Sequence, residues 1–378
     1  MKRLVICCDG TWNRVDQEDQ GKPCPTNVVK LAYRVAKHDK NGVQQVIFYD
    51  QGVGTGNILD KYSGGALGKG LEDNIWDAYR FLIANYELGD EIYVFGFSRG
   101  AFTARSIVGM IRKCGILDRL AVEQYSAARN LYRSPDEPDE TVCQAFRAKN
   151  SISGGAPIPI QMIGVWDTVG ALGIPVRGLR ALTADKYEFH DTELSGTVKH
   201  AYHALAIDER RVPFLPTLWD AKPKPQQQVE QVWFAGVHTD VGGGYPETGL
   251  SDITLSWMIE KAEHAGLVFD RAVMKAHPLH PDPTLKQHNS KTGRYALTPG
   301  ADRVIGRTAK TSKSLPPGTE DLRQTVDDSV LVRWMLTDWR PPEVASFLKR
   351  RGIRFCSHGH GTTEDPCTTH NQKTTPVV

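Results

Sequence analysis

The fold is decided by the stretch DEIYVFGFSRGAFTAR, residues 90–105. It starts as a short apolar strand that ends at Gly96, and a helix begins near Gly100. Between them lies the pattern Gly-x-Ser-x-Gly, whose glycines let the chain fold back sharply and expose the Ser98 hydroxyl above the sheet edge. The pattern predicts a nucleophile elbow. A helix cap formed by Ser98 is the simpler alternative.

Apolar strands and helical patterns alternate along much of the chain. Strands are expected at about 3–8, 44–50, 91–96, 159–166 and 229–236, and helices near 26–38, 71–87 and 100–113. Strands that are apolar throughout are typical of a parallel sheet covered by helices on both faces. We therefore predict an open, doubly wound, mostly parallel α/β sheet with its ligand site at the carboxyl ends of the strands.

The length of 378 residues fits a single domain that carries insertions. The periodicity breaks in three places, and the end of the chain is polar. We expect one domain over residues 1–356, insertions near 118–158, 171–228 and 270–325, and a disordered tail over 357–378.

Composition argues against several classes of protein. Lys and Arg number 46 against 44 Asp and Glu, so the net charge of +2 gives no global field that would attract nucleic acid. No run approaches about 18 apolar residues, so no transmembrane segment is expected, and peripheral membrane contact stays open. The first apolar run stops at Asp9, too early for a signal peptide. We expect a cytoplasmic protein, with export by a signal-less route left open.

Neither a metal nor an organic cofactor is expected. The seven cysteines are odd in number and form no Cys-x-x-Cys pair, which favours free thiols. We interpret His200 and His203 as helix residues one turn apart, and no third ligand of matching spacing follows them. The histidines and cysteines between Cys356 and His370 form only a loose pattern in the polar tail.

Two glycine-rich segments raise the possibility of nucleotide binding. In QGVGTG, residues 51–56, the third glycine falls one position early for a dinucleotide fingerprint. In SGGALGKG, residues 63–70, Gly70 follows the lysine where Ser or Thr would bind magnesium. We interpret both segments as loops beside the site, and a nucleotide-dependent protein is the third and weakest hypothesis.

Polar residues follow the carboxyl ends of two later strands. Asp167 comes directly after the strand at 159–166, where a carboxylate could hold the tautomer of a catalytic histidine. His238 follows the strand at 229–236 and precedes three glycines, and it is the best candidate for a general base. Asp240 is a rival acid, but it is better placed to cap the next helix. A turn-capping aspartate and a satisfied loop histidine are the structural alternatives.

The turn after the first strand, CDGTWN at residues 8–13, could hold an oxyanion. The amides of Gly10 and Thr11 are expected to point toward the nucleophile, with Asp9 orienting the loop. The amide of Arg99, at the start of the helix that follows the elbow, would add a donor. The alternative is an Asx-turn that leaves the strand.

Five motifs taken together resemble one family. They are CDGTWN at 8–13, GFSRGAFTAR at 96–105, WDTVG at 166–170, HALAIDERR at 203–211 and HTDVGGGY at 238–245. Over about residues 1–260 the chain resembles the α/β-hydrolase family that includes the catalytic domain of type VI secretion phospholipase effectors. The resemblance implies an α/β-hydrolase-like fold with cap or insertion segments, and it implies Ser98 as nucleophile, Asp167 as acid and His238 as base.

These observations predict a serine ester hydrolase that works through an acyl-enzyme, with no cofactor. The expected partner is a small-molecule or lipid acyl ester, and a phospholipase or lipase is the specific form suggested by the resemblance. The alternative is a binding module that keeps the fold and recognises a lipid or a partner without turnover. The sequence carries no signal for oligomeric state.

Overall fold

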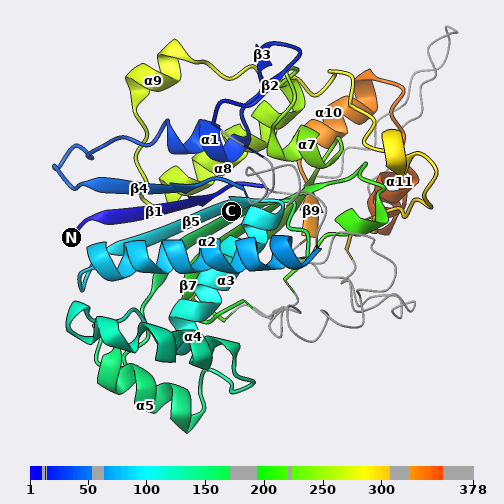
Figure 1. Cartoon of the computed structure of the whole chain (residues 1–378). Coiled ribbons are helices and arrows are strands. Elements are labelled where there is room, and N and C mark those ends of the chain that lie inside the picture. Colours follow the sequence, from blue (N-terminus) through cyan, green and yellow to red (C-terminus); the bar gives the residue numbers. More distant parts are fainter. Residues whose placement is uncertain are drawn as a thin grey trace, which may run out of the picture.

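The computed structural model describes residues 1–10, 13, 15–52, 64–170, 194–219, 224–306 and 324–351. Its centre is a seven-stranded sheet in the order β4-β1-β5-β6-β7-β8-β9, in which every neighbouring pair is parallel (Figure 1). The strands are β1 Arg3–Cys8, β4 Gln45–Asp50, β5 Glu91–Phe97, β6 Ile160–Trp166, β7 Val198–Ala206, β8 Gln228–Phe234 and β9 Gln324–Val326. The predicted doubly wound α/β sheet is confirmed. A small antiparallel pair, β2 Glu18–Asp19 and β3 Lys22–Pro23, lies apart from it.

Helices cover both faces of the sheet (Figure 1). One face packs against α2 Gly64–Asn85 and α3 Arg99–Cys114, and the other against α1 Asn27–Ala32 and α8 Gly249–His264. Side chains of β1 alternate between the two layers, because Leu4 and Ile6 join the first and Val5 and Cys7 the second. This double burial is the reason the strands are apolar throughout.

The remaining helices lie outside these two layers. The helices α4 and α5 pack beside α3, and α10 and α11 form a third apolar cluster with β8 and the edge strand β9 (Figure 1). The bounds are η2 Arg119–Gln124, α4 Tyr125–Arg133, α5 Thr141–Asn150, η3 Val212–Phe214, α7 His238–Gly242, α9 Arg271–Ala276, η4 Gly293–Tyr295, α10 Asp328–Leu336 and α11 Pro342–Arg350.

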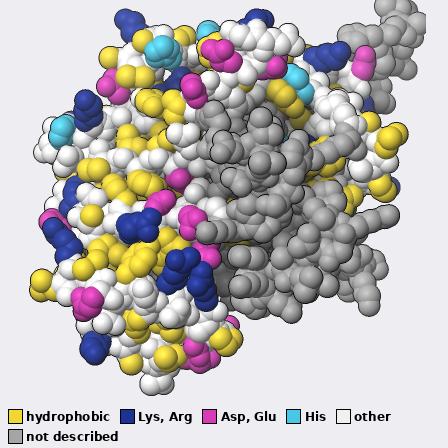
Figure 2. Space-filling model, in the orientation of Figure 1, with side chains coloured by type: hydrophobic (Ala, Val, Ile, Leu, Met, Phe, Trp, Pro, Cys, Tyr) yellow, Lys and Arg dark blue, Asp and Glu magenta, His cyan; other side chains and the backbone are white. Residues whose placement is uncertain are grey.

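The surface carries both signs of charge (Figure 2), and the described cysteines are unpaired. On the face shown in Figure 2, basic, acidic and hydrophobic side chains are interspersed. Five cysteines lie within the described part of the chain, and all five are free and buried. Among the described helices, none combines the length and the apolar character that a bilayer crossing requires.

Two local expectations are wrong. The segment with His200 and His203 is strand β7 in the middle of the sheet and not a helix, so the supposed insertion at 171–228 includes a core strand. Its short apolar run has no periodicity that separates a buried strand from a buried helix. The second glycine-rich segment is also no loop, because α2 begins at Gly64. Residues 53–60 and the proposed tail at 357–378 lie outside the described residues.

The N-terminal end of α3 lies against the sheet more closely than any side chain would allow. A Cβ on Gly96 would come within 2.7 Å of the Ala101 Cα, and a Cβ on Gly100 would overlap the carbonyl oxygens of Cys8 and Asp9. Both glycines of the Gly-x-Ser-x-Gly pattern are therefore required by packing. They bring the end of β5 and the start of α3 against the end of β1.

This close approach predicts opposite effects of two alanine substitutions in one helix. Gly100→Ala is expected to lower the free energy of unfolding by about 1–3 kcal/mol, because backbone atoms must move apart. Gly109→Ala is the matched control: no atom lies within 4 Å of its added Cβ, and replacing a helical glycine should stabilise by about 0.5–1 kcal/mol. Urea unfolding of both variants measures the difference. A Gly100→Ala variant as stable as the parent would contradict the packing argument.

Candidate active site

Ser98 lies at the turn between β5 and α3 in a backbone conformation that is rare for a non-glycine residue. Its φ is 60° and its ψ −122°. Its amide donates to the carbonyl of Trp166 at the end of β6, at 3.0 Å, which fixes the turn against the neighbouring strand. The Ser98 Oγ lies 2.8 Å from Nε2 of His238. Strained backbone of this kind is commonly found at functional sites.

His238 is the first residue of α7, just beyond β8. Its Nδ1 lies 2.5 Å from Oδ2 of Asp167, and its ring is held between the rings of Phe97 and Phe214, with centroids at 4.6 and 4.9 Å. Gly242, from the glycine run, leaves the space that the Phe97 ring occupies. Burial lowers the pKa of His238, and the hydrogen bond to Asp167 opposes that shift.

Asp167 follows β6 and is completely buried. Its φ of 40° is also in the left-handed region. Oδ1 accepts a hydrogen bond from the amide of Ala206 at 3.1 Å, and Oδ2 accepts one from His238. The structure thus places Ser98, His238 and Asp167 in one hydrogen-bonded chain, drawn from three strand ends.

Sequence reasoning missed Arg303, which forms a buried ion pair with Asp167. Its Nη1 lies 2.6 Å from Oδ1 and its Nη2 3.0 Å from Oδ2. Burial by itself would raise the pKa of Asp167, but the charge of Arg303 and the hydrogen bonds from His238 and Arg303 hold that pKa well below its usual range. Arg303 belongs to a stretch without periodicity or motif, so no local signal identifies it.

Glu209 is a second residue whose position was not foreseen. The run Asp208-Glu209-Arg210-Arg211 is most simply interpreted from the sequence as a solvated charge cluster, but Glu209 is only 1% exposed. It accepts hydrogen bonds from the amide of His238 at 3.3 Å, from Arg211 and from the Ser290 hydroxyl at 2.9 Å. Burial tends to raise the pKa of Glu209, and bonding to Arg211 outweighs this and lowers it. Arg210, by contrast, is exposed.

The turn after β1 is organised around the Asp9 carboxylate. It accepts hydrogen bonds from the Gly10 amide at 2.7 Å, the Thr26 hydroxyl at 2.7 Å and the Tyr49 hydroxyl at 2.8 Å. Asp9 therefore orients the loop as expected. The Gly10 amide already donates to Asp9, however, which argues against its expected role as a free oxyanion donor.

Thr11 and Arg99 are the other two predicted oxyanion donors. Thr11 lies outside the described residues. Arg99 is the first residue of α3, where backbone amides point out of the helix end and the helix dipole favours negative charge. Burial lowers the pKa of the Arg99 guanidinium to about 10, so the side chain is still charged at neutral pH.

Asp240 does not contact the imidazole of His238. Its Oδ2 accepts from the Val237 amide at 3.0 Å, and its Oδ1 lies 2.6 Å from Nδ1 of His288. It caps a helix as expected, although this helix is α7 and not the following α8. His203 is buried in β7, and its Nε2 accepts a hydrogen bond from the Thr168 amide. No group of three His, Cys, Asp or Glu residues in the described ranges is placed to hold a metal ion.

A further carboxylate, Asp50, lies beside Asp9 at the end of β4. The Asp9 amide donates to the Asp50 carbonyl at 3.0 Å, and Oδ2 of Asp50 is buried without a hydrogen-bond partner among the described residues. Burial raises the pKa of Asp50 to about 7; a hydrogen bond from Asn74 opposes the shift and the charge of Asp9 adds to it.

The chain matches a family model over most of its length. The family described as the type VI secretion system phospholipase effector Tle1-like catalytic domain matches residues 2–261. One relative is the uncharacterized protein YEL023C of Saccharomyces cerevisiae, which is 30% identical over 252 residues, or 58% of this chain and 34% of that protein.

Two solved structures are also similar. The first is an uncharacterized protein from Pseudomonas aeruginosa, with a TM-score of 0.43 and 20% identity over 71% of this chain and 46% of the other. The second is the Tle1 effector bound to the VgrG spike from the type VI secretion system, with a TM-score of 0.37 and 17% identity over 64% and 51%. The chain thus spans about a third to a half of the proteins it matches.

The raised pKa of Asp50 predicts a pH-dependent gain in stability for Asp50→Asn. The folded-state pKa is above the unfolded value, so the wild-type carboxyl costs stability increasingly as pH rises from about 4 to about 7. Asparagine removes that cost. We expect the variant to gain about 1–2 kcal/mol more at pH 8 than at pH 5, measured by urea unfolding. Asp73→Asn, on the exposed side of α2, is the control. An equal gain at both pH values would contradict the prediction.

Proposed function

The chain belongs to the family of Tle1-like phospholipase effector catalytic domains of the type VI secretion system, and we propose that it is a serine ester hydrolase of the phospholipase or lipase type. One observation carries the proposal: Ser98 Oγ, the His238 imidazole and the Asp167 carboxylate form a continuous chain with contacts of 2.8 and 2.5 Å. Such a chain suits nucleophilic acyl transfer.

The tautomer of His238 follows from its two partners. The Asp167 carboxylate can only accept hydrogen bonds, so Nδ1 carries the proton and Nε2 presents a lone pair to the Ser98 hydroxyl. His238 takes the hydroxyl proton as Oγ attacks the acyl carbonyl carbon. Asp167 stabilises the imidazolium that forms, and it stays ionised throughout.

The tetrahedral intermediate needs stabilisation of its oxyanion. The amide of Arg99 and the N-terminal end of α3 supply positive electrostatic potential beside Ser98. His238 then gives its proton to the leaving alcohol oxygen, and the acyl group remains on Ser98. A water molecule deprotonated by His238 releases the acid and restores the enzyme.

An apolar substrate is supported by the surroundings of His238. Phe214, whose ring contacts His238, stands between Val212 and Leu215, which are 39% and 46% exposed. Leu297 is 96% exposed. It lies two residues after Tyr295, whose ring packs on the Phe214 ring. We call Val212, Leu215 and Leu297 the apolar rim. Exposed apolar groups beside a reaction centre suit the acyl chains of a lipid.

The nucleophile is tested by Ser98→Ala. Hydrolysis of a p-nitrophenyl acyl ester should fall by about 10³-fold or more with the thermal unfolding temperature unchanged, because the attacking oxygen is gone. A fluorophosphonate probe should label the parent at Ser98 and label His238→Ala far more slowly. Ser106→Ala, a second serine of α3, is the control and should keep turnover. Persistent hydrolysis by Ser98→Ala would refute the proposal, and absence of both labelling and turnover in the parent would favour a binding module.

The apolar rim is tested separately with a charged substitution. Leu297→Asp should reduce hydrolysis of long-chain phospholipid in mixed micelles by about tenfold, because a carboxylate disfavours contact with lipid, while a soluble short-chain ester is hydrolysed as before. The control is Leu120→Asp. Leu120 is 92% exposed, and the adjacent Arg119 pairs with Glu87, which precedes β5 at the opposite edge of the sheet. Equal losses on both substrates would argue against a role in lipid contact.

A further inference from the structure

We propose that Arg303 is a positioning residue of the active site, so that the catalytic unit extends beyond the matched residues 2–261 and includes the stretch around residues 288–303. The inference rests on the proposed serine hydrolase function. In the active site, Arg303 fixes the orientation of the Asp167 carboxylate. Its positive charge also balances the negative charge that Asp167 presents to His238.

The geometry of the pair is that of a planar fork on a carboxylate. Both terminal nitrogens of Arg303 contact Asp167, at 2.6 and 3.0 Å, and they also donate to the carbonyls of Ala206, at 2.7 Å, and Phe214. Arg303 is 3% exposed and Asp167 is fully buried. Each carboxylate oxygen thus has two partners: Arg303 and the Ala206 amide on Oδ1, and Arg303 and His238 on Oδ2.

Arg303 meets a requirement that the hydrolase core leaves open. A buried carboxylate needs an opposite charge to remain ionised, and a neutral imidazole and a single amide do not supply one. The charge of Arg303 is the largest influence that opposes the effect of burial on the pKa of Asp167. Because bidentate contacts allow one orientation of the carboxylate, they also direct Oδ2 toward Nδ1 of His238.

The same segment contacts the site at three further points. The Ser290 hydroxyl donates to Glu209 at 2.9 Å, His288 binds Asp240 at 2.6 Å, and the Tyr295 ring packs on the Phe214 ring at 6.1 Å. Glu209 and Phe214 contact His238 directly, and Asp240 caps the helix that His238 begins, so residues that follow position 261 support the neighbours of His238. The C-terminal part of the chain therefore completes the walls of the site as well as the charge balance.

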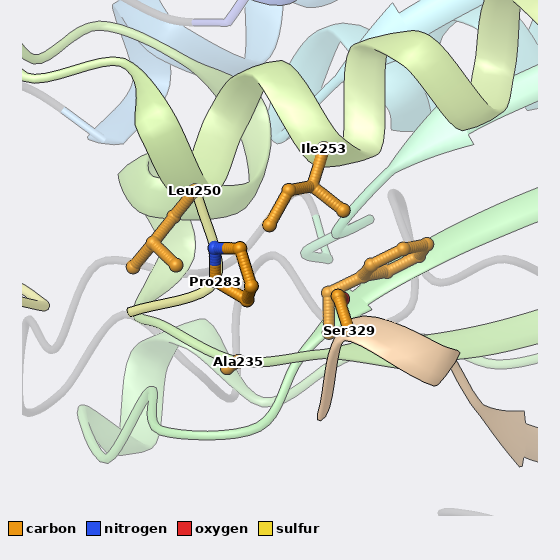
Figure 3. Close-up of a pocket in the computed structure, with 6 residues that line it drawn as sticks. Ala235, Leu250, Ile253, Pro283 and Ser329 are labelled. Atoms are coloured by element: carbon orange, nitrogen blue, oxygen red, sulfur yellow. The ribbon is translucent and has the colours of Figure 1, made fainter. Parts of the chain in front are cut away.

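Packing against the core keeps this part of the chain in place. Figure 3 shows Pro283 and Ser329 facing Leu250 and Ile253 of α8 and Ala235 after β8. The apolar gap between them is too small to hold a ligand. Pro283, which precedes Arg303, and Ser329 of α10 therefore pack against the core here, and the gap is not a separate binding site.

Removal of the Arg303 charge has a predictable effect on His238. The charged groups that face the imidazole are Asp167 after β6, Glu209 and Arg211 after β7, and Arg303 behind Asp167. Without Arg303, the negative charge of Asp167 is less balanced and favours protonated His238. The acidic limb of kcat/KM, which reports neutral His238, should then move to higher pH.

Two variants that fill the space of Arg303 carry the test. Arg303→Gln retains a hydrogen-bond donor and loses the charge: kcat on a soluble ester should fall by about 10²-fold with little change in KM, and the acidic limb should rise by about 0.5–1 pH unit. Arg303→Lys retains the positive charge but loses the bidentate contact of the guanidinium. The acidic limb should therefore stay near its parental pH, and kcat should be at least about tenfold higher than in the Arg303→Gln variant. The control is Arg271→Ala, which removes an exposed arginine of α9 that pairs with Glu263 of α8; it should keep the parental kcat and pH limb.

The outcomes separate this inference from the proposed function. Should Ser98→Ala remain active, the serine mechanism fails whatever Arg303 does. If Ser98 is required for turnover but a folded Arg303→Gln variant keeps the parental kcat and the parental acidic limb of kcat/KM, only the positioning role of Arg303 is overturned. A loss of kcat equal in Gln and Lys with an unmoved limb would show a structural role alone. Thermal unfolding of each variant verifies that the measured enzyme is folded.

Discussion

The site depends on one constraint: Asp167 must stay ionised where no water reaches it. Taking a carboxylate out of water costs several kcal/mol unless charge and hydrogen bonds compensate. Here the compensation comes from the Arg303 guanidinium, the Ala206 amide and the His238 ring. These groups belong to three different regions of the chain, so the sheet, the loops after its strands and the C-terminal segment must all be in place before the carboxylate is stable.

The same edge of the sheet also holds strained backbone. Ser98 and Asp167 are both non-glycine residues with positive φ, and they end adjacent strands, β5 and β6. Such conformations persist where the surroundings impose them. The Ser98 amide donates to Trp166, the residue before Asp167, so the two strained turns hold each other. The close fit of Gly100 against the end of β1 fixes the third side, and the hydroxyl is aimed at His238 as a result.

What could be predicted from the sequence was local, and what could not was long-range. The strand, turn and helix around Ser98 are determined by residues that are neighbours in the sequence, so the local motif predicts them. Strand β7 was misread because a short buried run has no diagnostic period. Glu209 was taken for a solvated residue because a run of charges does not show that one of them turns inward. Arg303 lies 136 positions from Asp167, and no spacing rule connects them.

The buried pair and the apolar rim meet in one substructure. The loops that carry Arg211 and Arg303 are joined by a bridge between Arg211 and Gly300 and by a hydrogen bond from the Ala301 amide to the Arg210 carbonyl at 2.9 Å. Leu297 precedes this junction, and Arg303 follows it. Leu297, which we propose contacts the lipid, therefore lies on the same loop as Arg303. Because Arg303 also donates to the Phe214 carbonyl, beside the ring that packs on His238, we expect substrate contact and the placement of the acid to be mechanically linked.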